Sequence, residues 1–289
     1  MNASMTVESV WRYPVKSMQG EEISEAEITD RGVLGDRAYA LMDRTTGHIA
    51  SAKHPRKWSK LLQCRAVFVE SPQLGQPLPP IWITLPDGTE ICSTQPDVDQ
   101  VLSAVVERDV TLLAEAPAAP TREADRTPID SFNFSQPEII REEGVAIAAP
   151  SGTFFDYAPL HILTTATLNR LQKLYPNGDF EVCRFRPNIV VATHGDQQSF
   201  IENDWLDHKL TLGTAALLYM IDPCPRCVIT TLAQGDLPHD LNILRTVGQH
   251  NQAASVTLAP GVVLPAVAGV YAKVLHGGKI HQGDAVGLK

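Results

Sequence analysis

Two cysteines three positions apart, in Cys224-Pro225-Arg226-Cys227, form the sharpest chemical feature of the sequence. A structural zinc site needs four ligands, and neither a second such pair nor two closely spaced histidines accompany this one. A thioredoxin-type redox pair opens a helix, whereas the β-branched run 228–232 favours a strand. Two interpretations remain: buried thiols that pack as small apolar side chains, or a single thiolate that binds a soft metal, with Arg226 favouring its deprotonated form.

Lys16 and Ser17 are the second candidate, because they follow directly on the predicted strand 7–15. A lysine at such a turn can hold a phosphate as a point charge, while the serine hydroxyl donates a hydrogen bond to it. An ordinary strand end with a solvated lysine explains the same residues, and the motif alone favours that simpler interpretation.

Two arginines complete the set of candidates. Arg37 follows a Gly-Asp pair in a predicted turn, where an Asp-Arg neighbour pair is most often structural. Arg186 precedes an apolar strand, and Asn188 offers both a donor and an acceptor. The guanidinium of Arg186 can bind an anion through paired hydrogen bonds, although an arginine at a sheet edge is again the simpler interpretation.

The elements that must position these residues are mostly short strands. In residues 5–112, β-branched and aromatic runs alternate with turn residues at a spacing typical of an antiparallel sheet or a barrel. One helix is predicted at 98–108, with Asp97 or Asp99 as its cap. The runs that predict strands are 7–15, 23–29, 37–43, 65–70, 81–85 and 89–93.

The second half of the chain mixes strands with two helices. The helices are predicted at 165–175, capped by Thr164 or Thr165, and at 237–247. The segment 114–130 has three prolines and mixed charge, which is typical of a connecting segment. The runs that predict extended structure are 155–165, 185–192, 209–213, 215–221, 226–232, 270–275 and 285–288. We therefore predict a mainly β fold with a few α-helices, in the α+β class.

Net charge limits the partners of the chain. Its 289 residues carry 24 Lys and Arg against 33 Asp and Glu, a formal net charge of −9. DNA, RNA and anionic lipid need a cationic face, so they are excluded as general partners. Residues 61–160 hold 5 basic and 15 acidic groups, which places the whole acidic excess in the middle of the chain. This segment could dock a redox partner that has basic patches.

Cysteine usage and the N-terminus predict a cytoplasmic protein. Five cysteines, with only one close pair, do not form a disulfide framework. The N-terminus has no basic start followed by an apolar run, and no stretch approaches the ~20 apolar residues that span a bilayer. We therefore expect a reducing compartment and no membrane partner.

Five segments, in this order, resemble the MOSC family, which is named for the C-terminal domain of molybdenum cofactor sulfurase. The resemblance is to its two-domain members of the amidoxime-reductase type. It implies an N-terminal MOSC β-barrel domain at 1–113, a connecting segment at 114–130 and a β-barrel MOSC domain at 131–289. The segments are WRYPVKS (11–17), GDRAYALMD (35–43), RFRPNIVV (184–191), the stretch around Trp205 ending at LTLG (210–213) and CPRCVITT (224–231).

The resemblance implies a molybdenum cofactor (molybdenum bound to a molybdopterin) held between the two domains. It assigns Cys227 as the ligand to molybdenum and as the catalytic residue. Lys16 and Ser17 would contact the pterin phosphate region. The residues with an implied cofactor-binding role are Lys16, Ser17, Arg37, Thr164, Arg186, Asn188 and Arg226.

The implied reaction is a two-electron reduction in which oxygen leaves an N-hydroxylated or N-oxide small molecule as water. Electrons would come from a separate protein of the ferredoxin, flavin or haem type, because the chain lacks the C-x₄-C-x₂-C spacing of a ferredoxin-type cluster. In such reductases an acidic D-P-x-T-G turn follows the cysteine motif. Here Asp236 stands in a shifted register, so we assign it no catalytic role.

Two alternatives have different cofactor chemistry. The main one is a non-catalytic module that carries the molybdenum cofactor, or sulfur as a persulfide on Cys227. Pyridoxal phosphate is disfavoured, because the domain that binds it in the sulfurases is missing here and no Schiff-base lysine stands out.

Overall fold

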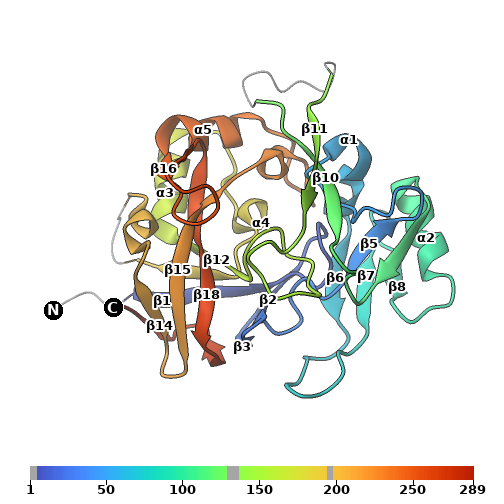
Figure 1. The fold of residues 1–289 in the computed structure, drawn as a ribbon, viewed down its shortest axis with the longest axis horizontal. Helices are drawn as coiled ribbons and strands as arrows, with labels where there is room; N and C mark the ends of the chain where they lie inside the picture. Colours follow the sequence, from blue (N-terminus) through green and yellow to red (C-terminus); the bar gives the residue numbers. More distant parts are fainter. Residues whose placement is uncertain (1–4, 129–136, 194–197) are drawn as a thin grey trace.

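A closed barrel of seven strands occupies one side of the molecule, at the left in Figure 1. The computed structural model describes residues 5–128, 137–193 and 198–289. Around the barrel the order is β13-β12-β18-β15-β14-β20-β1, and β1 pairs with β13 to close it. Only the β12–β13 pair is parallel among these seven. The barrel strands are β1 (Met5–Arg12), β12 (Leu160–Thr164), β13 (Ile189–Ala192), β14 (Lys209–Leu212), β15 (Ala216–Pro225), β18 (Val267–His276) and β20 (Ala285–Leu288).

Strand β1 brings the first described residues of the chain into this barrel. Its residue Val10 lies opposite Ile189 of β13, and Thr6 lies opposite Ala285 of β20. Val7 and Val10 would face opposite sides of a regular strand, because side chains alternate. A register shift between Val7 and Ser9 turns both valines into the barrel core, as a β-bulge does.

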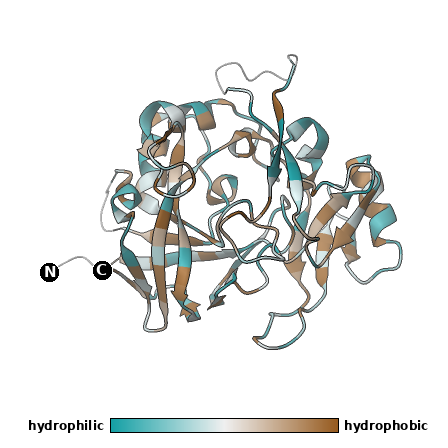
Figure 2. Ribbon diagram, in the orientation of Figure 1, coloured by the Kyte–Doolittle hydropathy of each residue, from teal (hydrophilic) through white to brown (hydrophobic). Residues whose placement is uncertain are grey.

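Apolar side chains of the other strands fill the barrel interior. On β12, β15 and β18 they recur at every second position, and Figure 2 shows them interleaved with polar residues along the strands. Trp205, at the end of the 3₁₀ helix η3 (Ile201–Trp205), adds the largest buried side chain of this core. Examples of the alternation are Leu160 and Ile162, Leu218 and Met220, and Val270 and Ala272.

Smaller sheets pack beside the barrel. The sheet β6-β7-β8 and the pair β5–β9 surround a second core. The sheet β19-β3-β4 instead contributes Ala26, Ile28, Val33 and Ile280 to the barrel core. Strand β10 pairs with β11, β16 pairs with β17, and β2 pairs with β1. These strands are β2 (Glu21–Ile23), β3 (Glu25–Thr29), β4 (Gly32–Val33), β5 (Ala40–Asp43), β6 (Arg65–Phe68), β7 (Ile81–Thr84), β8 (Glu90–Cys92), β9 (Val110–Leu113), β10 (Thr121–Asp125), β11 (Ile140–Gly144), β16 (Ala253–Ala254), β17 (Val263–Leu264) and β19 (Gly278–His281).

Helices are few and short, so the predicted mainly β fold is confirmed. The predicted helices at 98–108 and 165–175 are α2 and α3, and the predicted helix at 237–247 begins only after Asp240, whose carboxylate accepts a hydrogen bond from the Asn242 amide. The helices are α1 (Pro55–Trp58), η1 (Ser59–Gln63), α2 (Val98–Val106), α3 (Thr165–Leu174), α4 (Val182–Phe185), η4 (Val228–Thr231) and α5 (Asn242–His250), with η marking 3₁₀ helices.

The strand predicted at 226–232 is wrong. Strand β15 ends at Pro225, and the β-branched run after Cys227 forms the 3₁₀ helix η4. The hydroxyls of Thr230 and Thr231 donate to carbonyls three positions earlier, which gives the backbone an alternative to a ladder. The strand predicted at 185–192 also begins later than expected, because α4 ends at Phe185 and β13 starts at Ile189.

The predicted connecting segment 114–130 contains a strand. Its residues 121–125 form β10, which pairs with β11. The predicted boundary at 130 lies outside the described residues, so the division at this point stays a prediction.

The described residues contain five free cysteines. Within the same residues, no helix has both the length and the apolar character needed to cross a membrane.

Candidate functional site

One pocket gathers side chains from segments far apart in the sequence. Its walls come from the turn after β1, the turn before β5, the end of α4 and the end of β15. The loop before β12 and the strand β18 complete it. The predicted site residues that line it are Lys16, Ser17, Arg37, Arg186, Asn188, Arg226 and Cys227.

The lining of this pocket is strongly cationic. Two lysines and three arginines face one carboxylate, Asp156, among the described residues that line it. The excess of cations stands out in a chain whose formal net charge is −9. Cations gathered in a recess concentrate a positive potential there, so the pocket is suited to a small anion. The cations are Lys16, Lys53, Arg37, Arg186 and Arg226.

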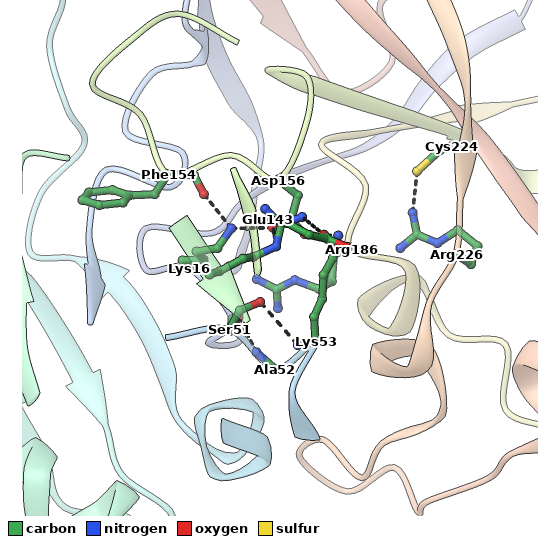
Figure 3. A network of polar contacts seen from close by, with 12 residues as sticks. Lys16, Ser51, Ala52, Lys53, Glu143, Phe154, Asp156, Arg186, Cys224 and Arg226 are labelled. Atoms are coloured by element: carbon green, nitrogen blue, oxygen red, sulfur yellow. Dashed lines mark hydrogen bonds and ion pairs between the residues drawn. The ribbon is translucent and has the colours of Figure 1, made fainter. Parts of the chain in front are cut away.

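Asp156 joins two of the lysines into one network, which Figure 3 shows from close by. The Nζ of Lys16 lies 2.5 Å from one carboxylate oxygen and donates to the Phe154 carbonyl at 2.8 Å. The Nζ of Lys53 lies 3.2 Å from the other oxygen. Burial acts to raise the pKa of Asp156, but Lys16, Lys53 and Arg122 hold it well below its ordinary value. Burial lowers the pKa of Lys16 to about 7, against the opposing effect of Asp156.

Tyr13 supports two of the pocket arginines. The guanidinium carbons of Arg37 and Arg186 each lie 4.4 Å from the centre of its ring, within the range of cation–π contact. Burial raises the pKa of Tyr13, so the phenol is neutral at ordinary pH. Burial lowers the pKa of Arg186 to about 10, and repulsion from Arg37 adds to this effect. An anion bound between these like charges would relieve their repulsion.

Asp36 fixes the geometry around the two arginines. Its carboxylate accepts from the Tyr13 amide at 2.7 Å, from the Asn188 side chain at 2.8 Å and from Arg37. The preceding Gly35 has φ of +83°, and a Cβ there would lie 2.6 Å from the Phe68 ring. The Gly-Asp-Arg motif is therefore a turn that aims Arg37, because glycine permits the backbone and aspartate holds the neighbours.

Three pocket residues have a backbone conformation that L-amino acids rarely adopt. Ser17, Arg37 and Arg186 have φ of 66°, 47° and 53°, and they are three of the seven non-glycine residues with positive φ in the described chain. Strained backbone of this kind persists only where the surrounding structure enforces it, and it is most frequent at functional sites. Its concentration here marks the pocket as the candidate site on grounds independent of charge.

The two cysteines of the motif have different surroundings. Cys224 is buried at the end of β15, and its Sγ accepts from Nη1 of Arg226 at 2.6 Å. Cys227 is partly exposed and lines the pocket. Nη2 of Arg226 donates to the Phe185 carbonyl. These two contacts therefore engage the guanidinium with Cys224 and Phe185, and neither of them reaches Cys227.

Two family models match the chain. The model of the MOSC N-terminal beta barrel domain matches residues 4–63, and the model of the MOSC domain matches residues 150–287. Together they cover more than half of the sequence, and every residue that lines the pocket lies within one of the two matched ranges. The chain belongs to the MOSC family.

Curated relatives of this MOSC protein include mitochondrial amidoxime reducing components. Component 2 of Rattus norvegicus is 26% identical over 250 residues, and component 1 of Homo sapiens is 25% identical over 264 residues. Each match covers 78% of this chain and 66% of the relative, so the chain spans about two thirds of the length of these proteins.

Two solved structures are also similar to the chain. The YuaD protein of Bacillus subtilis has a TM-score of 0.44 and 11% identity, covering 99% of this chain and 95% of that one. YiiM of Geobacillus stearothermophilus has a TM-score of 0.32 and 17% identity, covering 52% and 67%.

The structure does not bring Thr164 to the pocket of this MOSC protein. Its hydroxyl accepts from the Thr167 amide at the start of α3 and donates to the buried carboxylate of Glu202 at 2.7 Å. Thr164 is fully buried and is absent from the pocket lining. Its hydroxyl therefore serves as a helix cap, which is the other role that the sequence predicts for it.

Sequence reasoning missed several pocket residues. Lys53 and Asp156 stand in segments without a distinctive motif, and only the fold brings them to Lys16. His161 lies on β12, and burial, followed by the effect of Arg226, holds its pKa well below the usual range. The only sequence signal for these positions was a charged or aromatic side chain beside an apolar run.

The donor set fits an anionic, thiolate-bound cofactor in charge and in chemistry. Nε of Arg226 is buried without a hydrogen-bond partner, so one donor of the lining is available. Oγ of Ser17 accepts from the Ala52 amide at 3.1 Å, which leaves its hydrogen to donate. The described residues hold no group of three or more His, Cys, Asp and Glu side chains arranged for a metal, and the cysteine among the described lining residues is Cys227. The cavity encloses ≈ 90 Å³, below the ~300–1,000 Å³ of sites that engulf a ligand, so it is too small to enclose a ligand of that size completely.

Proposed function

We propose that this protein is a molybdenum-cofactor-dependent reductase of N-hydroxylated or N-oxide small molecules. The observation that carries the proposal is the pocket itself: five cations and one carboxylate surround a recess with a partly exposed thiol at its wall. The names of the relatives at about 26% identity support the same class of activity. The overall reaction takes up two electrons and two protons and releases water.

The residues of the chain would hold the cofactor at its two ends. Cys227 would supply the soft thiolate that molybdenum prefers. Lys16, Ser17 and Arg37 would bind the phosphate end, with Lys53 as an additional cation. When bound, the molybdenum cofactor supplies the two-electron chemistry at the substrate oxygen.

Arg186 and Asn188 are held in place by neighbouring groups of the protein. Arg186 is held by the Met18 carbonyl at 2.7 Å and by Tyr13, and Asn188 is held by Asp36 and the His161 amide. These side chains would therefore meet a ligand in a fixed geometry, which reduces the ordering cost of binding. Pyridoxal phosphate has no support in this arrangement, because Lys16 is engaged with Asp156 and Phe154.

Metal and pterin analysis tests the proposal directly. Protein purified from a host that makes the cofactor is expected to contain molybdenum and pterin, and to reduce benzamidoxime with a chemical electron donor. Cys227→Ser is expected to lose both metal and activity. Protein without molybdenum or pterin would overturn the proposal.

The carrier hypothesis predicts a different result in the same preparation. A persulfide on Cys227 would appear in the intact mass as one added sulfur atom that a reductant removes. That mass without turnover of benzamidoxime would favour the non-catalytic module over the enzyme.

We further propose that the electron donor is a separate protein that docks through charge. The excess acid between residues 61 and 160 suits a donor with basic patches, and such association slows as salt screens the charges. Electron-transfer rates that stay constant with ionic strength would contradict this part of the proposal.

A further inference from the structure

Arg184 has a buried charge and no carboxylate bound to it. It lies on α4, two positions before the pocket residue Arg186, and its side chain has no exposed surface. Within the described part of the chain, the hydrogen bonds of its guanidinium all go to main-chain oxygens and none goes to a carboxylate. Burial lowers the pKa of Arg184, against the opposing effects of Cys183 and Asp179. A cation kept under such conditions must be compensated by its hydrogen bonds.

Four main-chain carbonyls accept those hydrogen bonds. Nε donates to Asp179 and Nη2 donates to Pro238, each at 2.8 Å. Nη1 donates to both Thr230 and Leu232 at 3.2 Å. Arg184 therefore ties α4 to the loop before it and to two points of the segment 230–238.

Two of these carbonyls lie at the end of η4, the 3₁₀ helix that begins directly after Cys227. The last carbonyls of a helix have no partner inside the helix and carry a partial negative charge. Arg184 supplies both the donor and the positive charge at Thr230 and Leu232. The end of η4 is thus fixed by one side chain from another element.

Thr230 transmits this attachment to the cysteine. Its amide and its hydroxyl both donate to the Cys227 carbonyl, at 3.1 and 3.0 Å. Arg184 also lies on the short helix α4, and Arg186 is the residue that directly follows the end of this helix. One rigid connection therefore links the thiol segment to an arginine of the pocket wall.

We propose that Arg184 is a positioning residue for Cys227, which it holds in the wall of the pocket through the carbonyls of Thr230 and Leu232. Arg184 is absent from the pocket lining, so it acts through η4 and not by touching a ligand. The importance of Cys227 rests on the proposed function, but the placement of its thiol can be measured on the chain alone.

Alkylation of the folded chain by iodoacetamide, followed peptide by peptide with mass spectrometry, is the test. Cys92 on β8 serves as the internal reference, because it is also partly exposed and belongs to a different sheet. In Arg184→Met, the Cys227 rate relative to Cys92 is expected to rise at least about fivefold, because a loosened η4 exposes the thiol. Arg184→Lys keeps the charge and is expected to restore part of the difference. Arg141→Met, at an exposed position of β11, is the matched control and is expected to leave the ratio unchanged.

Two results would overturn the proposal. One is an unchanged ratio in folded Arg184→Met, and the other is an equal rise at both thiols, which indicates general destabilisation. If Arg184→Met does not fold, hydrogen exchange of the natural chain decides. The amides of Thr230 and Leu232 are expected to exchange as slowly as those of β15, and rapid exchange contradicts the proposal. Absence of molybdenum would refute the proposed function and leave these measurements intact.

Discussion

At the scale of single residues, the two thiols of the Cys-Pro-Arg-Cys motif have different roles. Burial raises the pKa of Cys224, whereas Arg226 and Tyr271 act in the opposite direction. The sulfur of Cys224 accepts a hydrogen bond from Nη1 of Arg226, and this contact holds the guanidinium in the pocket wall. Cys227 lines the pocket itself. The same residue type is structural at one position and chemically accessible three positions later.

Substitution at position 224 separates these tasks. Cys224→Ser keeps an acceptor for Arg226 and is expected to retain most of the benzamidoxime reduction. Cys224→Ala leaves Nη1 of Arg226 without its partner, and kcat/KM is expected to fall about tenfold, the equivalent of one lost hydrogen bond to a charged group. Steady-state kinetics with a chemical donor measure this, with metal content determined in each sample. A greater loss in Cys224→Ser than in Cys227→Ser would mean that the ligand is the other cysteine.

Lys16 makes anion binding dependent on pH. Its pKa is lowered to about 7, so the cation that attracts an anion is present below that pH and is lost as the pH rises through it. Sulfate is a suitable probe, because it stays fully charged over this range. Its dissociation constant is expected to rise about 3–10-fold between about pH 6 and about pH 8. Thermal shift titrations measure it, and in Lys16→Met the pH dependence is expected to disappear.

The sequence identified the pocket residues that belong to motifs and missed those that do not. Lys16, Arg37 and Arg186 stand beside turns or strand ends, where a charged side chain next to glycine, proline or an apolar run is noticeable. Lys53 and Asp156 lie about a hundred positions apart in ordinary loops. They become neighbours only through the fold, and no local pattern encodes that contact.

At the scale of elements, residue preference and tertiary packing disagree in one instructive place. Val228, Ile229 and Leu232 pack with Ala52 and Leu62 in one apolar cluster, and the segment forms a short 3₁₀ helix there instead of the strand that its β-branched residues favour. The threonines between them bond to earlier carbonyls. Alternation predicted the barrel strands well because those strands bury one face, whereas the segment after Cys227 is buried on all sides.

The cap of α3 provides a test at this scale. Thr164→Val removes both the acceptor for the Thr167 amide and the donor to the buried Glu202 carboxylate. We expect the free energy of unfolding to fall by about 1–3 kcal/mol in urea titrations. Sulfate binding should be unchanged, because Thr164 lies outside the pocket lining. Thr45→Val, at an exposed turn position, is the control, with an expected change within about 0.5 kcal/mol.

At the scale of the whole molecule, the acidic residues are concentrated in one segment of the sequence, whereas the fold gathers basic residues from other segments into one pocket. The acidic excess belongs to residues 61–160, whereas all five pocket cations come from the segments on either side of that stretch, which are net basic or net neutral. The pocket therefore keeps a positive potential inside an acidic protein. Charge counted along the sequence predicts no polyanionic partner, and only the fold shows a recess with a lining suited to a small anion.

Closure of the barrel gives the last prediction. Strand β1 lies between β13 and β20, so a fragment of residues 131–289 would expose both as unpaired edges, which favour aggregation. We expect this fragment to lack a cooperative thermal transition in circular dichroism. Residues 5–12 appended after Lys289 through a linker of roughly 2–5 residues should restore it, because β20 and β1 are antiparallel neighbours. The same appended strand with Val7→Asp and Val10→Asp is the control and should fail, since both valines face the core. A fragment that melts cooperatively without β1 would show that the barrel closes on its own.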